Sequence, residues 1–156
     1  MAEQLAAWAE SVAAGYRFAR RHTFDPQQAS AFAHLAGDDN PIHHDGEFAS
    51  GTRFGGLIVS ATHTTALMMG LVASHFAQRG TVLGLQFSVD LLRPVGSTET
   101  VTLEWVVKSA SYHPKGGQLL DLEGEIRDCA EDVRVRARGR VLVGATFRKQ
   151  AAAASE

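Results

Sequence analysis

The chain is poor in the features that mark disulfide-rich, metal-binding and nucleic-acid-binding proteins. Cys129 is the only cysteine among 156 residues, so no intrachain disulfide can form and no cluster of thiolates can hold a metal. The 15 Lys and Arg residues are offset by 17 Asp and Glu residues, and the net charge of −2 gives no field that attracts polyanions. These shortages argue against nucleic acid as a partner, and they favour a reducing, cytoplasmic location.

Long uninterrupted apolar stretches are absent as well. The longest apolar run, residues 55–73, contains a serine, a histidine and three threonines, which would be costly against lipid tails. The first residues lack the basic stretch of a secretory signal, and Leu5, Trp8 and Val12 follow at the spacing of one helix face. We therefore expect a short docking helix that ends at Gly15, and no membrane as a partner.

The length fits one domain. Globular domains commonly contain about 100–150 residues, and we see no internal repeat. Residues 1–150 are therefore assigned to a single domain, and only the alanine-rich end, residues 151–156, is expected to be disordered.

Residues 16–35 predict a strand followed by a helix. Asp25 can cap the helix, with Pro26 at the first helical position and Gln28 three residues after the cap, so the helix should cover residues 26–35 and stop near Gly37. Before it, five residues share one side of an extended segment, which is the two-residue period of a strand: Tyr16, Phe18, Arg20, His22 and Phe24.

The middle of the chain predicts a loop and then a long helix. Residues 37–54 are rich in Asp, Gly, Pro and Asn, with one brief helical segment near residues 47–49. Residues 57–78 are apolar nearly all round, which is typical of a helix enclosed by other elements. At about 1.5 Å per residue, that helix would span roughly 33 Å.

The last third alternates in the manner of four antiparallel strands joined by hairpins. Turns are expected at residues 112–117 and 128–132. Because the long helix is the one element able to cover the apolar face, the layer rule predicts an α+β fold, a curved antiparallel sheet around a long helix. The alternating positions are Leu83, Leu85, Phe87, Val89 and Leu91 on one segment, and Val101, Leu103, Trp105 and Val107 on the next.

Three polar residues that suit acid–base chemistry crowd into the loop. Asp38, Asn40 and His43 lie within six residues, and Pro41 stiffens the segment between them. A carboxylate and an imidazole that converge on one water can hold it, remove its proton and return a proton later. On spacing alone, the same residues also fit an ordinary capped turn with a surface histidine.

The position of this loop favours the catalytic interpretation. It leads directly to Gly55 and Gly56 and then to the long helix, whose first N–H groups are free to bind an oxyanion or a thioester carbonyl. A base, an acid and an electrophilic site therefore lie close together in the chain.

The sequence here resembles the MaoC-like (R)-specific enoyl-CoA hydratases. The resemblance rests on residues 32–43 (FAHLAGDDNPIH) and 53–59 (RFGGLIV), and it continues through 84–87 (GLQF) and 92–95 (LRPV). It implies a single hot-dog fold, usually paired as a homodimer or higher homo-oligomer. It also implies that Asp38 and His43 bind the water added to a trans-2-enoyl thioester, with Asp38 as the principal base.

The resemblance further implies what the substrate carries and what holds it. No dissociable cofactor is needed, because coenzyme A or phosphopantetheine is part of the substrate, and an acyl carrier protein is a possible partner. In the family, a His-Gly pair at the start of the long helix supplies a backbone donor to the carbonyl, whereas this chain has Ser60 and Ala61. An alanine N–H donates as well, so the expected substrate-binding residues are Asn40, Gly55, Gly56, Ser60 and Ala61.

Other chemistry-bearing residues have simpler explanations. His43, His44 and Asp45 are adjacent and should diverge, so no metal site is expected. His63 is expected to be a hydrogen-bonded core histidine. Met68 and Met69 would line an acyl tunnel or pack in the core. Four alternating arginines indicate a solvated strand face or, alternatively, a surface for phosphates or a carrier protein: Arg134, Arg136, Arg138 and Arg140, with Arg53 and Arg93 as similar candidates.

Two other functions remain open from the sequence. A hot-dog acyl-CoA thioesterase could use the same carboxylate. A non-catalytic acyl-binding subunit of a heteromeric dehydratase would have the fold without the reaction, although the presence of both Asp38 and His43 argues against it.

Overall fold

The computed structural model describes residues 12–78, 80–114 and 116–144. Most of the expected docking helix and the alanine-rich end lie outside these residues. In chain order the described elements are β1 (Arg17–Thr23), α2 (Pro26–Leu35), the 3₁₀ turn η1 (Pro41–His43), α3 (Gly46–Ser50), α4 (Ala61–Ala77), β2 (Thr81–Leu91), β3 (Thr100–Tyr112), β4 (Gln118–Arg127) and β5 (Val133–Gly144).

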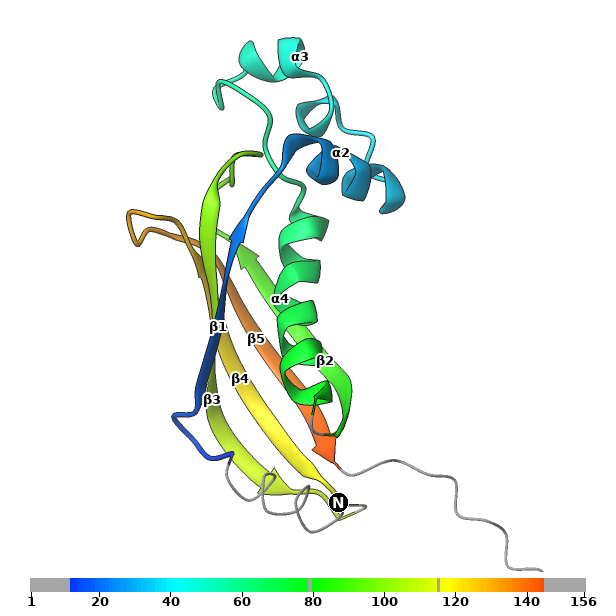
Figure 1. Ribbon diagram of the computed structural model, residues 1–156, viewed down its shortest axis with the longest axis vertical. Coiled ribbons are helices and arrows are strands. Elements are labelled where there is room, and N and C mark those ends of the chain that lie inside the picture. The colour runs from blue at the N-terminus through cyan, green and yellow to red at the C-terminus, as the bar shows by residue number, and fades with distance from the viewer. Residues whose placement is uncertain (1–11, 79, 115, 145–156) are drawn as a thin grey trace, which may run out of the picture.

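The strands form one antiparallel sheet in the order β1-β3-β4-β5-β2. This sheet curves along α4, while α2 and α3 lie beyond the N-terminal end of α4 (Figure 1). The predicted α+β architecture, with one long helix against a curved antiparallel sheet, is confirmed. The described helices include none that is long and apolar enough to cross a bilayer.

The helix α2 follows its capping signals closely. The Asp25 carboxylate accepts a hydrogen bond from the Gln28 N–H at 2.9 Å, and the helix covers the predicted residues 26–35. Gly37 has φ +76°, a conformation that favours glycine, and it turns the chain out of the helix. The loop that carries Asp38 therefore starts at a defined point and in a defined direction.

The prediction for the long helix was wrong in two respects. The helix begins at Ala61 rather than near residue 57, because residues 57–59 are extended and pair with the segment before β3. Val59 N–H donates to the Val95 carbonyl at 2.8 Å, and Ser97 N–H donates to the Leu57 carbonyl at 3.0 Å. The helix is also not enclosed all round, since the sheet covers only one side and Met69 on the opposite side is 41 % exposed.

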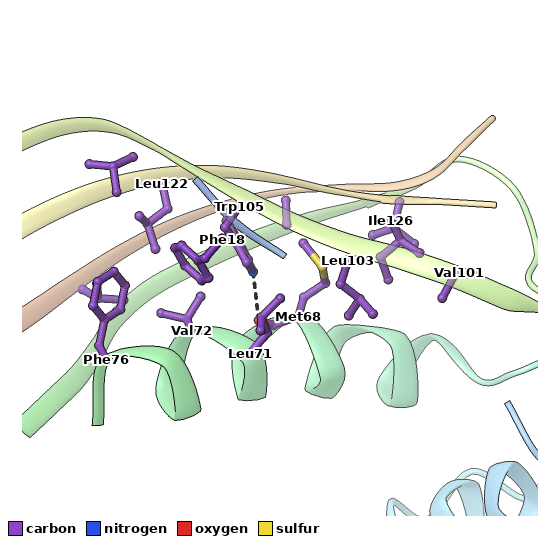
Figure 2. Packing of buried hydrophobic residues seen from close by; sticks show 14 of the residues in the cluster. Phe18, Met68, Leu71, Val72, Phe76, Val101, Leu103, Trp105, Leu122 and Ile126 are labelled. Carbon is purple, nitrogen blue, oxygen red and sulfur yellow. Dashed lines mark hydrogen bonds between the residues drawn. The ribbon is translucent and has the colours of Figure 1, made fainter. Parts of the chain in front are cut away.

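The core lies between α4 and the sheet, with Trp105 at its centre (Figure 2). Trp105 is fully buried, and its indole N–H donates to the Met68 carbonyl at 3.0 Å. This bond ties strand β3 to the middle of α4, so the polar atom of the indole is satisfied inside the core.

The edge strand β2 departs from its predicted alternation. Its pairing with β5 shifts between Gly84 and Gln86, so Leu83 faces Leu142 while Phe87 faces Gly139. Leu142 and Gly139 are three residues apart and lie on opposite faces of the sheet. Leu83 and Phe87 therefore do too, because one extra residue in a strand reverses every side chain beyond it.

Candidate active site

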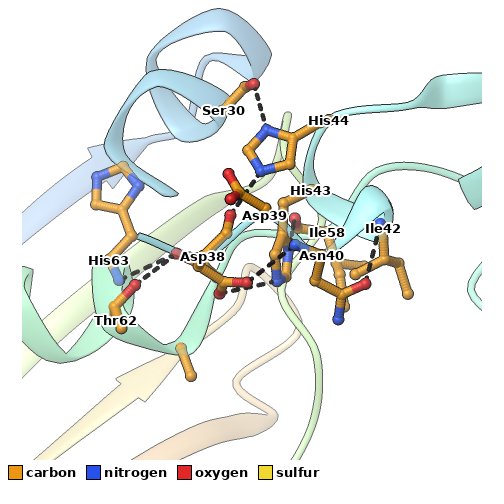
Figure 3. Close-up of polar contacts among 12 residues, drawn as sticks. Ser30, Asp38, Asp39, Asn40, Ile42, His43, His44, Ile58, Thr62 and His63 are labelled. Carbon is orange, nitrogen blue, oxygen red and sulfur yellow. Dashed lines mark hydrogen bonds and ion pairs between the residues drawn. The ribbon is translucent and has the colours of Figure 1, made fainter. Parts of the chain in front are cut away.

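Asp38 and His43 form a close pair at the end of the sheet nearest α2. The His43 Nε2 atom lies 3.4 Å from the Asp38 Oδ2 atom (Figure 3). The His43 side chain is 9 % exposed and the Asp38 side chain 30 %, so water can reach the carboxylate while the imidazole is largely shielded. The two groups can thus act on the same small molecule.

The loop around this pair is held by local capping. The Asn40 side chain accepts a hydrogen bond from the Ile42 N–H at 3.3 Å and so caps η1, with Pro41 at its first position. The Asn40 N–H donates to the Asp38 Oδ1 atom at 3.3 Å. Asn40 therefore orients the carboxylate through its main chain. Its side chain caps the turn and does not line the cleft described below.

The segment before α4 fixes His43 from the other side. The Ile58 N–H donates to the Ile42 carbonyl at 3.3 Å, and the His43 Nδ1 atom lies 2.9 Å from the Ile58 carbonyl. A carbonyl only accepts, so Nδ1 carries a proton and donates it. In the neutral imidazole, Nε2 is then the atom with the free lone pair, and it is the atom that faces Asp38.

His44 holds the main chain of Asp38, a role that the sequence did not indicate. Its Nε2–H donates to the Asp38 carbonyl at 2.7 Å, and its Nδ1 accepts from the Ser30 hydroxyl at 2.7 Å. The ring also stacks on His34, with centroids 3.8 Å apart. His43 and His44 are nearly perpendicular, as expected of adjacent residues that diverge. This role of His44 depends on the position of Ser30 in the folded chain, because the Ser30 hydroxyl holds the His44 ring.

Asp38, His43 and Ala61 line one cleft of about 360 Å³. Its remaining wall is mainly apolar. It is contributed by the segment before α4, by α4 itself, by the end of β2 and the segment that follows it, and by β5. These residues are Arg53, Phe54, Ile58, Val59, Thr64, Leu91, Leu92, Arg93, Pro94, Val95 and Val135. An acyl group would find the carboxylate and imidazole at one end and apolar side chains further in. This space is called the dyad cleft below.

The first turn of α4 borders the dyad cleft at Ala61 and Thr64. Ser60 is the N-cap and is fully buried; its hydroxyl accepts from the His63 N–H at 3.4 Å and hydrogen-bonds with the Thr62 hydroxyl at 2.9 Å. Ala61 is the first helical residue, and its N–H has no acceptor within the helix. Of the two residues, Ser60 supports the helix while Ala61 lines the dyad cleft.

Gly55 and Gly56 lie beside the dyad cleft rather than in it. They line a second, open cleft of about 590 Å³ that shares Arg53, Phe54, Ile58 and Pro94 with the first. Gly55 has φ +69°, so it is required for the bend that brings residues 57–59 next to η1.

The arginines near the site differ in their partners. Arg53 lies at both clefts, with its guanidinium 4.8 Å from the centre of the Phe54 ring. Arg93 pairs with Asp132 at 3.1 Å. Of these two cations, Arg53 lies where the two clefts meet, and it is the one that could contact an anionic part of a substrate.

Three of the four alternating arginines of β5 are paired with carboxylates of β4 or of the turn that follows it. Arg134 contacts Asp128 at 2.7 Å, and its hydrogen bond lowers the pKa of that carboxyl group. Arg140 contacts Asp121 at 2.7 Å and lowers the pKa of Asp121 in the same way. Arg136 contacts Glu125 at 3.1 Å. This pairing favours the solvated strand face over a phosphate-binding surface.

His63 is a buried histidine packed between aromatic rings. Its ring stacks on Phe32 at 4.3 Å and meets Phe24 edge-on at 5.3 Å. Burial, and then the nearby His22, lower the pKa of His63. Its Nδ1 atom has no hydrogen-bond partner among the described residues, so the histidine is buried as expected but lacks the expected hydrogen bond at this atom.

Comparisons with known proteins agree on one family. A family model described as a MaoC-like domain matches residues 8–117. An (R)-specific enoyl-CoA hydratase of Aeromonas caviae is 32 % identical over 97 residues, which are 62 % of this chain and 72 % of that protein.

Solved structures give the same result. The (R)-hydratase of A. caviae involved in PHA biosynthesis superposes with a TM-score of 0.76 at 25 % identity, covering 86 % of this chain and 98 % of the other. A MaoC-like dehydratase of Rhodospirillum rubrum superposes with a TM-score of 0.75 at 25 % identity, covering 89 % and 97 %.

Proposed function

Since the chain belongs to the MaoC-like domain family, we propose that it is a hydro-lyase that interconverts trans-2-enoyl and (R)-3-hydroxyacyl thioesters. The observation that carries the proposal is the placement of Asp38, His43 and Ala61 on one largely apolar cleft. Such a cleft combines a base, a second group that can hold the attacking water and a main-chain donor, and hydration of a conjugated thioester can use all three.

In the forward direction, Asp38 and His43 hold a water between them. The carboxylate of Asp38 takes a proton from this water as the water oxygen forms a bond to C3. The π electrons of the C2=C3 bond move toward C2 and the thioester oxygen. The proton is then delivered to C2, so that water is added and Asp38 is regenerated. The reverse sequence eliminates water.

His43 contributes through its fixed tautomer. Because Nδ1–H donates to the Ile58 carbonyl, Nε2 is oriented toward the water position beside Asp38. A neutral Nε2 accepts a hydrogen bond from the water, and this aligns one oxygen lone pair with C3. Asp38 is left as the principal base.

Negative charge develops on the thioester oxygen when C3 is attacked. The N–H of Ala61, the first residue of α4, is the donor that we assign to this oxygen, helped by the positive end of the helix dipole. A donor of this kind typically contributes about 2.7–4 kcal/mol to the lowering of the barrier. The methyl group of Ala61 does not affect the donor itself.

The wider setting of the reaction is also part of the proposal. The acyl group is carried by coenzyme A or by the phosphopantetheine of an acyl carrier protein, and no dissociable cofactor takes part. Arg53, which lines both clefts, is suited to bind the anionic carrier. A homodimer in the cytoplasm is the proposed form, and exposed leucines on the edge strand β2 support a self-association surface: Leu83, Leu85 and Leu91.

The test is incubation of the purified chain with crotonyl-CoA, a four-carbon 2-enoyl thioester. Loss of enoyl absorbance without release of free thiol, with (R)-3-hydroxybutyryl-CoA as the product, would support the proposal. Free thiol without hydration would instead establish the acyl-CoA thioesterase. No conversion by the single chain, with activity gained on adding a second subunit, would establish the non-catalytic subunit.

A further inference from the structure

We infer that Met68 and Trp105 close the inner end of the dyad cleft, so that the protein accepts 2-enoyl groups of about four to six carbons and rejects longer ones. The inference rests on the proposed function, because it assumes that the thioester carbonyl lies at the Ala61 N–H. It goes beyond that function in naming the class of acyl group.

The dyad cleft runs inward from Ala61 between α4 and the sheet. On the helix side its inner residue is Thr64, which lies about one turn after Ala61 and is 3 % exposed. On the sheet side the inner residue is Val135, which is 1 % exposed, whereas its partner in the β2–β5 pairing, Leu91, is exposed and lies at the open side of the cleft. Thr64 and Val135 mark how far the open space reaches.

The next level of the sheet is filled. One residue pair further along each strand lie Ala137 on β5, Gly124 on β4 and Trp105 on β3, which are paired in register. Trp105 and Met68 are both fully buried, and Figure 2 shows them meeting between the sheet and α4. The dyad cleft is lined by Val135 but by none of the residues of this level.

Gly124 shows how completely the two side chains fill this level. A Cβ atom at this position would lie 2.5 Å from Trp105 ring atoms and 2.7 Å from the Met68 methyl carbon. The indole and the thioether therefore occupy the volume directly above the glycine backbone. The hydrogen bond from the indole N–H to the Met68 carbonyl holds the ring in place, so it does not swing aside for a longer substrate.

The spacing along α4 sets the length of the acyl group. Met68 follows Ala61 by seven residues, a rise of roughly 10 Å, and contact between carbon atoms begins at about 4 Å. About 6 Å then remains beyond the carbonyl carbon. Each bond of an extended alkyl chain advances roughly 1.3 Å, given a carbon–carbon bond near 1.5 Å. Four or five further carbons fit, and a longer chain meets Met68.

The experiment compares 2-enoyl-CoA substrates of four, six, eight and ten carbons with the full-length chain. We expect kcat/KM to fall by at least about tenfold between six and eight carbons, since one methylene group too many in a closed pocket has an effect of this size. Met68→Ala should raise the ratio of eight-carbon to four-carbon kcat/KM by about tenfold. Met68→Val, which also removes the thioether methyl, covers the case in which the alanine variant does not fold.

Met69→Ala is the matched control. It deletes the same side chain one residue away, on the exposed side of α4, and it should leave both the activity and the chain-length profile unchanged. A general destabilisation of the helix would change the chain-length profile of the Met68 and Met69 variants alike. Opening of the inner end of the cleft would change it only in the Met68 variants.

The outcomes separate this inference from the proposed function. Efficient hydration of the four-carbon substrate together with equal hydration of the ten-carbon substrate would overturn the length limit and leave the function intact. If no thioester is hydrated, the proposed function fails, and titration with butyryl-CoA and decanoyl-CoA still reports on the cleft. Tighter binding of butyryl-CoA than of decanoyl-CoA would then support a cleft closed by Met68 and Trp105. Equal or weaker binding of butyryl-CoA would overturn it.

Discussion

The two sides of the dyad cleft provide chemistry in different ways. On one side, the proposed reaction uses the side chains of Asp38 and His43: Asn40 and His44 donate hydrogen bonds to Asp38, and His43 donates one to the Ile58 carbonyl. On the other side, the first turn of α4 offers a main-chain N–H at Ala61. A side-chain site depends on residue identity, whereas a main-chain site tolerates exchange of the side chain. The four changes below test that difference, from the largest expected effect to the smallest.

The change expected to have the largest effect is Asp38→Asn. It keeps the size of the side chain and its acceptor for the Asn40 N–H but removes the base, so kcat for hydration should fall by about 10²–10⁴. Asp39→Asn is the control, because the neighbouring carboxylate is exposed and contacts only His34 among the described residues. Full turnover by a folded Asp38→Asn protein would contradict the assigned base.

On the helix side, Ala61→Pro should be the next most damaging change. Proline is favoured at the first helical position, and Ser60 already has the extended ψ of 147° that a following proline requires. The substitution therefore deletes the N–H with little effect on the helix. We expect kcat to fall about 10²–10³-fold.

Ala61→Gly is its counterpart. It keeps the N–H and should retain activity close to that of the original chain. Equal kcat for the proline and glycine variants, both folded by circular dichroism, would remove the main-chain donor from the mechanism.

His44→Ala tests how far the side-chain half depends on support from α2. Loss of the donor to the Asp38 carbonyl should let the loop shift and lower kcat by roughly tenfold to a hundredfold, with KM little changed. His44→Gln places an amide donor at a similar reach and should recover most of the loss. If glutamine gives no more recovery than alanine, His44 only fills space.

His63→Phe has the smallest expected effect. It changes a residue of α4, and the measured quantity is the pH dependence of the free energy of unfolding. Because burial lowers the pKa of His63 below 6.5, the unfolded chain binds a proton at a higher pH than the folded chain. The free energy of unfolding should therefore decrease as pH falls below about 6.5 and level off below the folded pKa.

The phenylalanine variant lacks this contribution and should show a shallower pH dependence in chemical denaturation. His22, whose pKa is lowered in the same direction by burial and by Arg20, remains in the variant and contributes its own slope. An unchanged slope would mean that His63 does not contribute to the pH dependence.

Features that depend on near neighbours were predictable from the sequence. The cap of α2, the stop at Gly37 and the stiff turn at Pro41 follow from residues within a few positions of one another. The order of elements and the α+β architecture follow from hydrophobic periodicity. The pairing of Asp38 with His43 could be predicted for the same reason, since only four residues separate them.

Features that depend on distant strands were not predictable. The start of α4 is delayed to Ala61 because Val59 pairs with Val95, and the faces of β2 are set by a bulge against β5. The role of His44 depends on Ser30, which is 14 residues away on another element. In each case a tertiary contact decided between local alternatives of similar energy.

The position of β1 has a consequence for the order of folding. The strands β3, β4 and β5 are joined by short turns, whereas Arg17 of β1 meets Glu104 of β3 across 87 residues. Contacts so distant in sequence form late, because the intervening loop must first be closed. We therefore expect the chain to complete its central sheet before β1 docks and brings α2 and the Asp38 loop into place. Catalytic competence would then be the last property to appear during refolding.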